Sequence, residues 1–386
     1  MSVEVRSAIM PTYARYPLTL VRGEGCRVWD DAGRAYLDFA AGIASVPLGH
    51  AHPRWVEAVR AQAGELVHVS NLYATLPQER LAGRLAELAG FGLTFFANSG
   101  AEANEAALKL ARKHGRARGG LEVVALEGSF HGRTFATLAA TGQPAKHAPF
   151  APLPEGFVHV PPNDVAALEA AVGERTAAVL LEPVLGEGGV VPLAAEFLLA
   201  ARRLATAAGA LLIHDEVQTG VGRCGEWFAS QATPGAEPDV FTLAKGLGNG
   251  LPIGVAVARE EFAFGPGEHA STFGGGPVVC AAALAVLDTI EAEDLLRNAR
   301  ERGDQLRGAL GGLPGVGEVR GAGLLLGAAL EADRAGDLVR ALIAKGALAT
   351  EAGPGVVRVT PPLIVTSAEV EEFVAAFAGA AGEVFG

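Results

Sequence analysis

The stretch "ALLIHDEVQTG", residues 210–220, carries an apolar run directly into two carboxylates. Residues 210–213 have the composition of a buried strand, and Asp215 and Glu216 stand where that strand ends. A carboxylate at the buried end of a strand is costly unless a cation or a hydrogen-bond donor meets it. The stretch therefore predicts a strand that delivers an acidic side chain to a site, and it raises the question of what that side chain binds.

Short apolar runs alternate with helix-forming segments over the middle of the chain. Strand-like runs occur at 93–98, 121–126, 176–183, 210–216, 239–246 and 252–258, and helical segments occur at 101–115 and 194–209. This alternation predicts an α/β fold with a mainly parallel sheet and helices on both faces. Open sheets of this kind bind ligands at the carboxyl ends of their strands, which is where the polar residues fall.

The pattern differs at the two ends of the chain. From about residue 278 onward, long helices and short strands replace the alternation, and the first 60 residues are rich in strands and turns. We therefore expect a large domain formed by 61–277. A smaller α+β domain is expected from both chain ends, 1–60 and 278–386.

Composition limits the classes of function. Half of the 386 residues are hydrophobic, 19% are charged and the formal net charge is −12, which disfavours general binding to nucleic acid or anionic membranes. The three cysteines are isolated in sequence, without the spacing of a zinc site or a disulfide framework. The stretch at 1–17 lacks a secretory signal, and the longest uncharged run, 270–287, contains "FGGGP". We expect a soluble, cytoplasmic protein without a bound metal ion.

The segment "ANSGAEANEAALKLARKHG" (97–115) predicts a helix with an anion-binding start. Ser99 followed by Glu102 fits a capping box, and the bare N–H groups after Ser99 face a loop that follows a strand. A phosphate group would bind there. Most capped helices bind nothing, so this segment does not decide the function by itself.

Two further segments carry chemistry at strand ends. In "GSFHGRTF" (128–135), Phe130 could stack on a ring and Arg133 could bind a carboxylate, although a hydrophobic plug beside a solvated arginine has the same sequence. In "TLAKGLGNG" (242–250), Lys245 follows an apolar strand. A desolvated lysine there is a nucleophilic amine suited to Schiff-base chemistry, and a lysine that extends to solvent is the alternative.

These segments together answer the question about Asp215. A protonated pyridine nitrogen needs a carboxylate, a phosphate needs a helix N-terminus, a ring face needs an aromatic residue and an aldehyde needs a lysine. Asp215, residues 99–101, Phe130 and Lys245 supply these groups at strand ends. The sequence therefore predicts that pyridoxal 5'-phosphate is what Asp215 binds.

The whole chain resembles the class III (ω-amino acid) aminotransferases, which have the type I fold of pyridoxal-phosphate enzymes, and among them the acetylornithine aminotransferases. The resemblance is carried by "LGHAHP", "SNLYATLPQERLAGRL", "FFANSGAEANEAALKLARK", "FHGRT", "LEPVLGEGG", "HDEVQTGVGR", "LAKGLGNGLPIG", "STFGGGP" and "VVRVTPPL". The family usually has Asn at Gly276, commonly has Thr at Cys224, and usually reads "PIGA" where this chain reads "PIGV". None of these departures removes a group assigned to catalysis.

The resemblance implies a role for each matching residue. Lys245 is implied to carry the cofactor and then to move the proton, and Asp215 to pair with the ring nitrogen. The cofactor-binding set is Ser99, Gly100, Ala101, Phe130, Asp215, Glu216, Val217, Gln218, Lys245 and Thr272. Thr272 is implied to reach the phosphate of a partner subunit, so that the protein is a homodimer with shared active sites. The substrate-binding set is Arg133, Glu187, Ser271 and Arg358.

Glu187 has a physical rationale of its own. An ω-amine has no carboxylate beside its reacting carbon, whereas glutamate has one, so Arg358 would be unpaired whenever the ω-amine is bound. A movable Glu187 can pair with Arg358 then and release it to glutamate. A solvated loop carboxylate in "GEGGV" is the alternative.

The expected reaction moves the ω-amino group of N2-acetylornithine to 2-oxoglutarate, giving N-acetylglutamate semialdehyde and glutamate for arginine biosynthesis. Succinyl-diaminopimelate, a carrier-linked lysine precursor and free ornithine remain alternative donors, because each is an ω-amine beside a distal carboxylate. A nicotinamide-dependent oxidoreductase is a remote alternative. The match of "GVGRCG" (220–225) to G-x-G-x-x-G suggests it, but these glycines are separated from the strand and no good helix follows them.

Overall fold

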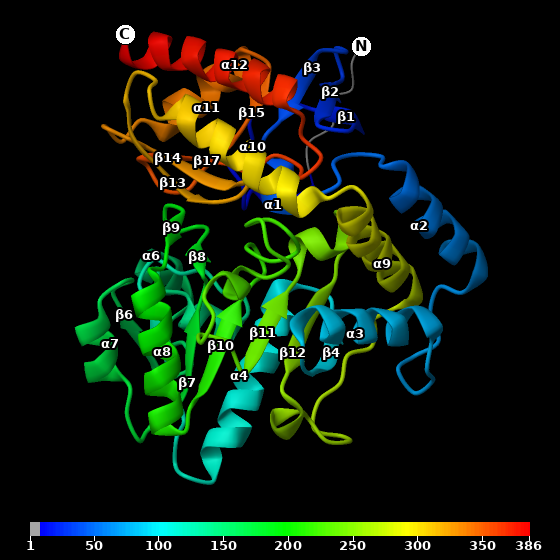
Figure 1. The fold of residues 1–386 in the computed structure, drawn as a ribbon, viewed down its shortest axis with the longest axis vertical. Helices are drawn as coiled ribbons and strands as arrows, with labels where there is room; N and C mark the ends of the chain where they lie inside the picture. Colours follow the sequence, from blue (N-terminus) through cyan, green and yellow to red (C-terminus); the bar gives the residue numbers. More distant parts are fainter. Residues whose placement is uncertain (1–7) are drawn as a thin grey trace.

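The computed structural model describes residues 8–386; residues 1–7, part of the expected small domain and of the stretch searched for a secretory signal, lie outside the described residues. A seven-stranded sheet forms the lower half of the molecule in Figure 1. Its strands are β4 (Leu93–Ala97), β5 (Glu122–Leu126), β6 (Phe157–Val160), β7 (Thr176–Leu181), β10 (Leu211–Asp215), β11 (Val240–Leu243) and β12 (Gly254–Ala258). The runs predicted as strands all form strands of this sheet.

The sheet has the order β4-β12-β11-β10-β7-β5-β6. Strands β11, β10, β7, β5 and β6 pair in parallel, whereas β12 is antiparallel to both β11 and β4. The expectation of a mainly parallel sheet is confirmed. The reversed strand follows from chain length, because the connection 244–253 holds no crossover helix and a parallel partner requires one.

Helices cover both faces of this sheet, as the strand pattern requires. Alternate residues of β10 point to opposite faces. Leu211 and Ile213 pack with α4 (Gly100–Arg116), whereas Leu212 packs with α8 (Ala195–Ala208). Asp215 continues the row of Leu211 and Ile213, so its side chain is delivered to the α4 face.

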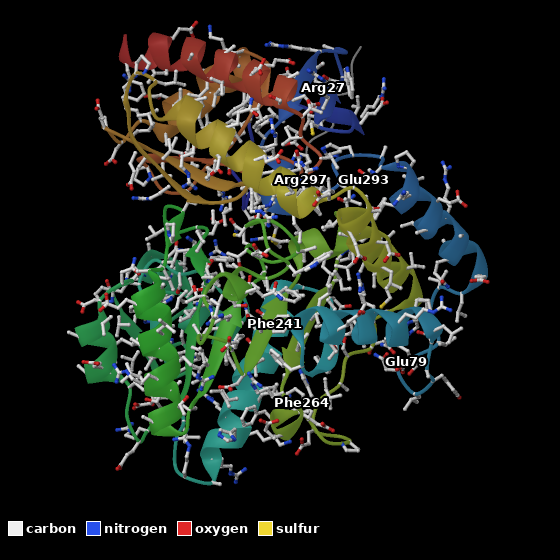
Figure 2. All side chains as sticks on the ribbon, viewed as in Figure 1. Arg27, Glu79, Phe241, Phe264, Glu293 and Arg297 are labelled. Carbon is white, nitrogen blue, oxygen red and sulfur yellow. The ribbon has the colours of Figure 1, made fainter. Side chains whose placement is uncertain are left out.

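Both chain ends contribute to the upper half of the molecule in Figure 1. One sheet has the order β1 (Leu20–Glu24), β2 (Arg27–Asp30), β3 (Ala35–Asp38) and β15 (Ala347–Leu348). A second sheet has the order β13 (Val316–Ala322), β14 (Leu325–Leu330), β17 (Val356–Val359) and β16 (Thr350–Glu351). Arg27 at the top of Figure 2 pairs with Glu372, 2.5 Å away on α12 (Ser367–Phe385). This ion pair and the β3–β15 pairing join the two ends of the chain.

The remaining elements complete the layers and the loops. They are α1 (Ala41–Ala44), α2 (Pro53–Glu65), α3 (Leu76–Ala89), α5 (Phe135–Ala140), α6 (Pro144–His147), α7 (Val165–Ala171), β8 (Val184–Leu185), β9 (Val191–Pro192), α9 (Pro277–Ala292), α10 (Leu295–Leu310) and α11 (Ala335–Ala344). Asp294, with φ of 51°, separates α9 from α10. Helix α9 packs on α2 and α3 beside the large sheet (Figure 1). No helix within residues 8–386 combines the length and apolar character needed to cross a membrane.

Candidate active site

A cavity of about 460 Å³ lies at the carboxyl ends of β10 and β11. Its lining residues come from loops that are far apart in sequence and share this edge of the sheet. They include Asn98, Ser99, Gly100, Ala101, Asn104, Phe130, His131, Arg133, Glu182, Asp215, Val217, Gln218 and Lys245. Most of the expected cofactor residues are therefore brought together.

The start of α4 forms one end of the cavity. Ser99 is the N-cap, and its Oγ accepts the backbone N–H of Glu102 at 3.2 Å. The carboxylate of Glu102 accepts the N–H of Asn98 at 2.6 Å rather than that of Ser99, so the expected capping box is displaced by one residue. Within residues 8–386, the N–H groups of Gly100 and Ala101 have no hydrogen-bond acceptor. The helix start can thus donate to an anion.

Gly100 is required by close packing at this helix start. A Cβ atom at Gly100 would lie 2.9 Å from Cγ1 of Val217, which lines the cavity. Gly254 of β12 allows the backbone of Ser99 to approach it equally closely, because a Cβ there would meet the Ser99 carbonyl oxygen at 2.0 Å. The helix start is therefore fixed between β12 and the segment that follows Asp215.

Asp215 is 3% exposed and is held by several hydrogen-bond partners. Its Oδ2 lies 2.8 Å from Nδ1 of His131 and accepts the side-chain amide of Asn104 at 2.7 Å. Its Oδ1 accepts the N–H of Val217 at 3.1 Å. Thr242 lies 3.4 Å from Oδ1 and donates to Oδ1 of Asn104 at 2.7 Å, so it orients the amide that holds Asp215. The carboxylate is thereby fixed in one position.

Lys245 starts the short turn that follows β11. Its backbone has φ of 36°, in the left-handed region that is costly for a residue with a side chain. Burial lowers the pKa of the Lys245 amine, and the charge of Arg358 adds to this shift, while Glu187, Glu182 and Asp215 oppose it. A lysine with a lowered pKa has a larger neutral, nucleophilic fraction.

Glu182 connects two loops of the site. Its Oε2 accepts the N–H of Phe130 at 2.9 Å and its Oε1 accepts the N–H of Gly186 at 3.2 Å. Burial raises the pKa of Glu182 to about 7; His131 counteracts this shift, and the nearby charge of Asp215 adds to it. Glu182 therefore ties the loop of the candidate ring-stacking residue to the loop that carries Glu187.

Arg358 and Glu187 form an ion pair next to the cavity. Arg358, on β17, is 1% exposed, and its Nη1 donates to Oε1 of Glu187 at 2.5 Å. The same nitrogen donates at 3.1 Å to Gly186 O and to Oε1 of Gln218, and Nε donates at 3.1 Å to Thr350 Oγ1. Burial alone would raise the pKa of Glu187, but the charge and hydrogen bond of Arg358 bring it below its usual value.

Five of the expected residues do not line the cavity: Glu187 and Arg358 form the ion pair next to it, and Glu216, Ser271 and Thr272 lie elsewhere. The carboxylate of Glu216 points to the loop at 229–230, where it accepts the N–H groups of Ala229 and Ser230 at 2.9 and 2.8 Å. Ser271 and Thr272 lie on a separate cavity beside β4, and Thr272 is exposed. Ser271 nevertheless lies near the site, because its Oγ is 3.4 Å from the side-chain amide of Asn98, which lines the cavity.

Four residues that contact expected site residues had no role predicted from the sequence: Asn104, His131, Glu182 and Thr242. Two weak signals could have found some of them. Asn104 is a polar residue on the buried face of α4, and Glu182 ends the apolar run of β7. His131 and Thr242 carry no comparable signal, because only the register between strands brings them to Asp215.

Comparison with known proteins supplies the family. Residues 9–380 match the family described as aminotransferase class-III. The chain belongs to the class III aminotransferases. It is similar to the acetylornithine aminotransferase of Gloeobacter violaceus, with 53% identity, covering 96% of this chain and 95% of that protein.

Two solved aminotransferase structures have the same fold. The ornithine aminotransferase of Toxoplasma gondii is 32% identical, with a TM-score of 0.92, over 98% of this chain and 92% of that one; it is described with partial occupancy of pyridoxal phosphate. The N-acetylornithine aminotransferase of Stenotrophomonas maltophilia is 35% identical, with a TM-score of 0.84, over 96% and 97% of the two chains. The expected type I aminotransferase fold is confirmed.

Class III aminotransferases use pyridoxal phosphate, and the residues of this cavity fit that cofactor. Free N–H groups at 100–101 suit its phosphate, and the buried Asp215 suits a protonated ring nitrogen. Lys245 supplies an amine for the aldehyde, and Phe130 supplies an aromatic face. The protein is a pyridoxal-phosphate-dependent aminotransferase.

Proposed function

We propose that this chain transfers the ω-amino group of N2-acetylornithine to 2-oxoglutarate, giving N-acetylglutamate semialdehyde and glutamate in arginine biosynthesis. The full-length similarity to the acetylornithine aminotransferase of Gloeobacter violaceus carries the proposal. Two arginines at different places around the cavity support it, because the two substrates present carboxylates at different distances from the reacting nitrogen. Arg133 lines the cavity, and Arg358 lies behind Gln218.

The proposed cofactor contacts follow from the cavity. Pyridoxal phosphate, when bound, withdraws electrons from the carbon that bears the amino group and so stabilises a carbanion there. Asp215 would keep the ring nitrogen protonated, Gln218 would bind the ring hydroxyl, and Phe130 and Val217 would pack on the ring. Residues 99–101 hold the phosphate. Glu216, whose carboxylate is engaged with 229–230, supports the strand end instead of contacting the cofactor.

Lys245 has two proposed tasks. It holds the cofactor covalently between turnovers, and its freed amine then moves the proton at the reacting carbon. The lowered pKa of Lys245 supports both tasks, because a neutral amine is needed to attack the aldehyde and to accept a proton.

Arg133 and Ser271 are proposed to bind the carboxylate that lies distal to the reacting nitrogen, and Arg358 to bind the α-carboxylate of glutamate. Glu187 then acts as a gate that covers Arg358 while N2-acetylornithine is bound. The 2.5 Å ion pair supports this role, because it represents the covered position. Unlike Arg358, Glu187 is partly exposed and sits in a loop, so the carboxylate is the partner free to move.

We also propose a homodimer with shared active sites. Thr272 is exposed, away from the cavity of its own chain, beside Phe273, which is 66% exposed. Leu72 and Tyr73, on the loop that reaches Ser271 through Asn71, are 87% and 68% exposed. An apolar surface of this kind is typical of an interface between subunits. The division into a large domain at 61–277 and a small domain at 1–60 and 278–386 remains part of the same proposal.

The direct test compares kcat/KM for N2-acetylornithine, ornithine, succinyl-diaminopimelate and a carrier-linked lysine, each with 2-oxoglutarate. We expect N2-acetylornithine to be preferred. Higher efficiency with any other donor would overturn the assignment.

A second test replaces the lysine. Borohydride should fix the cofactor covalently to the wild-type chain but not to Lys245→Ala, and this variant should lose turnover. Normal turnover in Lys245→Ala would show that another residue holds the cofactor.

Ornithine is the second candidate donor, and one observation favours it. The ornithine aminotransferase of Toxoplasma gondii has a higher TM-score with this chain, 0.92, than the N-acetylornithine aminotransferase of Stenotrophomonas maltophilia, 0.84. The higher sequence identity to the Gloeobacter violaceus protein weighs against it, because side chains in the cavity set the donor and the backbone alone does not.

A further inference from the structure

A second cation lies beside Arg133, and the roles proposed above leave it unused. Lys146, on the short helix α6, is half-buried. Its Nζ lies 5.8 Å from the centroid of the Phe130 ring, and the guanidinium carbon of Arg133 lies 5.5 Å from the same centroid. Arg133 from a loop and Lys146 from α6 therefore bring two positive charges to the ring of Phe130, which lines the cavity.

Neither cation has a carboxylate partner within residues 8–386. Lys146 donates to the side-chain oxygen of Gln143, which is neutral, and Arg133 has neither an ion pair nor a hydrogen bond there. Burial lowers the pKa of Lys146, and the charge of Arg133 lowers it further, whereas Glu187 acts in the opposite direction. The two cations thus repel each other beside the ring of Phe130.

Such an arrangement stabilises a bound anion. An anion placed near two unpaired cations gains attraction from both and relieves their mutual repulsion. The same arrangement disfavours a positive charge at that place. The ligand end that fits is therefore a carboxylate without an ammonium group next to it.

We propose that Lys146 and Arg133 together bind the distal carboxylate of the amine donor, and that Lys146 selects donors whose α-amino group is acylated. This inference rests on the proposed function, because it assumes an ω-amine donor whose distal end enters beside Phe130. In N2-acetylornithine the α-nitrogen is a neutral amide. In free ornithine it is an ammonium group adjacent to the carboxylate, and two cations would repel it.

The test compares three variants of the full-length holoenzyme. Lys146→Met removes the charge and keeps a similar chain length, and Lys146→Arg keeps the charge. Lys109→Met is the matched control. Lys109 is also a lysine near an aromatic ring, and its Nζ lies 2.9 Å from a ring nitrogen of His269. Its ring is Phe264, with the centroid 5.9 Å away, whereas the ring beside Lys146 is Phe130, which lines the cavity.

We expect Lys146→Met to lower kcat/KM for N2-acetylornithine by about tenfold, the size of one lost charge-assisted contact in a partly exposed site. The kcat/KM for ornithine should stay constant or rise. The ratio of kcat/KM for N2-acetylornithine to kcat/KM for ornithine should therefore fall by at least the same factor. Lys146→Arg and Lys109→Met should keep the wild-type ratio. An unchanged ratio in Lys146→Met, or equal losses with both donors, would overturn the proposal.

A binding measurement gives a readout that needs no turnover. N2-acetylnorvaline and norvaline have the distal ends of the two donors but no ω-amino group to react. Calorimetry should show tighter binding of N2-acetylnorvaline to the wild type and a loss of that preference in Lys146→Met. Equal affinities in the wild type would also overturn the inference.

Failure of the inference is distinguishable from failure of the proposed function. If the wild type prefers N2-acetylornithine but Lys146→Met behaves like Lys109→Met, the donor assignment stands and the role of Lys146 is wrong. If the wild type prefers a different donor, the proposed function is wrong whatever the variants do.

Discussion

Asp215 and Arg358 are both almost fully buried at the edges of the same site, yet they are held in opposite ways. Asp215 is 3% exposed, and its partners are His131, Asn104 and the backbone that follows its own strand. Arg358 is 1% exposed, and its charged partner is Glu187, from a loop. Arg358 also donates to Gly186, Gln218 and Thr350, but among the contacts described for it Glu187 is the one that carries a charge.

The difference separates a permanent charge from an exchangeable one. The partners His131 and Asn104 are almost fully buried and cannot leave Asp215 without disrupting the fold, so its charge is always available to a cofactor ring. A loop carboxylate can leave Arg358 when a substrate carboxylate replaces it, because the site then stays neutral overall. The following predictions test this contrast.

Replacing the permanent charge should have the largest effect. In Asp215→Asn the ring nitrogen loses its anionic partner, and the new amide faces donors from His131 and Asn104. We expect kcat to fall on the order of a thousandfold, about 4 kcal/mol in the barrier, in both half-reactions alike. Stopped-flow absorbance of each half-reaction measures this. A loss confined to one half-reaction would contradict the role of Asp215 as a constant partner of the ring.

The raised pKa of Glu182, close to Asp215, predicts a pH effect on stability. Its folded pKa is about 7 and its ordinary value is 4.5, so its contribution to stability is complete below pH 4.5 and is lost as the pH rises to 7. The loss amounts to about 3 kcal/mol. Glu182→Gln removes this dependence, and the melting temperature of the variant should fall less than that of the wild type between pH 5 and 8.

The buried His214 also makes stability depend on pH, but it does so equally in the wild type and in Glu182→Gln. Burial lowers the pKa of His214 to about 3, so its contribution to stability is lost as the pH falls from 6.5 toward 3. That contribution is present in both proteins and cancels in the difference. The exposed Glu65→Gln serves as the control and should keep the wild-type pH profile. Parallel profiles for Glu182→Gln and the wild type would show that Glu182 titrates normally.

Removing the exchangeable charge should affect one half-reaction. Glu187→Gln keeps the shape of the side chain but cannot neutralise Arg358 when N2-acetylornithine is bound. We expect kcat/KM for N2-acetylornithine to fall roughly ten- to a hundredfold, while the half-reaction with glutamate is retained or accelerated. Single-turnover measurements with each substrate decide between the outcomes. Equal losses would mean that Glu187 only supports the loop.

The smallest effect on the kinetics is expected from replacing the threonines that contact the two charged residues, Thr350 beside Arg358 and Thr242 beside Asp215. Thr350→Val removes the acceptor of Arg358 Nε and should raise the KM for glutamate by about threefold, leaving the other half-reaction unchanged. Thr242→Val is the matched variant on the Asp215 side and should slow both half-reactions equally. Identical behaviour of the two variants would remove the distinction between the two charges.

Much of the fold and the cofactor site could be predicted because short stretches of sequence indicate both. Apolar runs with polar ends locate β10 and β11, and the helix start after Ser99 is marked by its N-cap. Asp215 and Lys245 were found because each directly follows such a run. The similarity to a family then supplied Arg358 and Glu187, whose contact joins residues 171 positions apart in the sequence.

The other features of the fold and the site could not be predicted, because they depend on how helices and strands that are distant in the sequence pack together. The reversed direction of β12 and the position of Asn104 beneath Asp215 follow from strand order and register. Lys146 was missed for the same reason, since α6 reaches Phe130 only in the folded chain. The places of Ser271 and Thr272, outside the cavity of their own chain, are also beyond any local pattern.

The reversed strand β12 also has a consequence for the order of folding. The hairpin of β11 and β12 spans residues 240–258, with Val240 opposite Ala258 and Leu243 opposite Val255, and Lys245 lies in its connection. Closing so short a loop costs little chain entropy, whereas the contacts of Asp215 with Asn104 and His131 close loops of 111 and 84 residues. We expect the lysine turn to be protected early in pulsed hydrogen exchange during refolding. The contact between Glu187 and Arg358 should be established last.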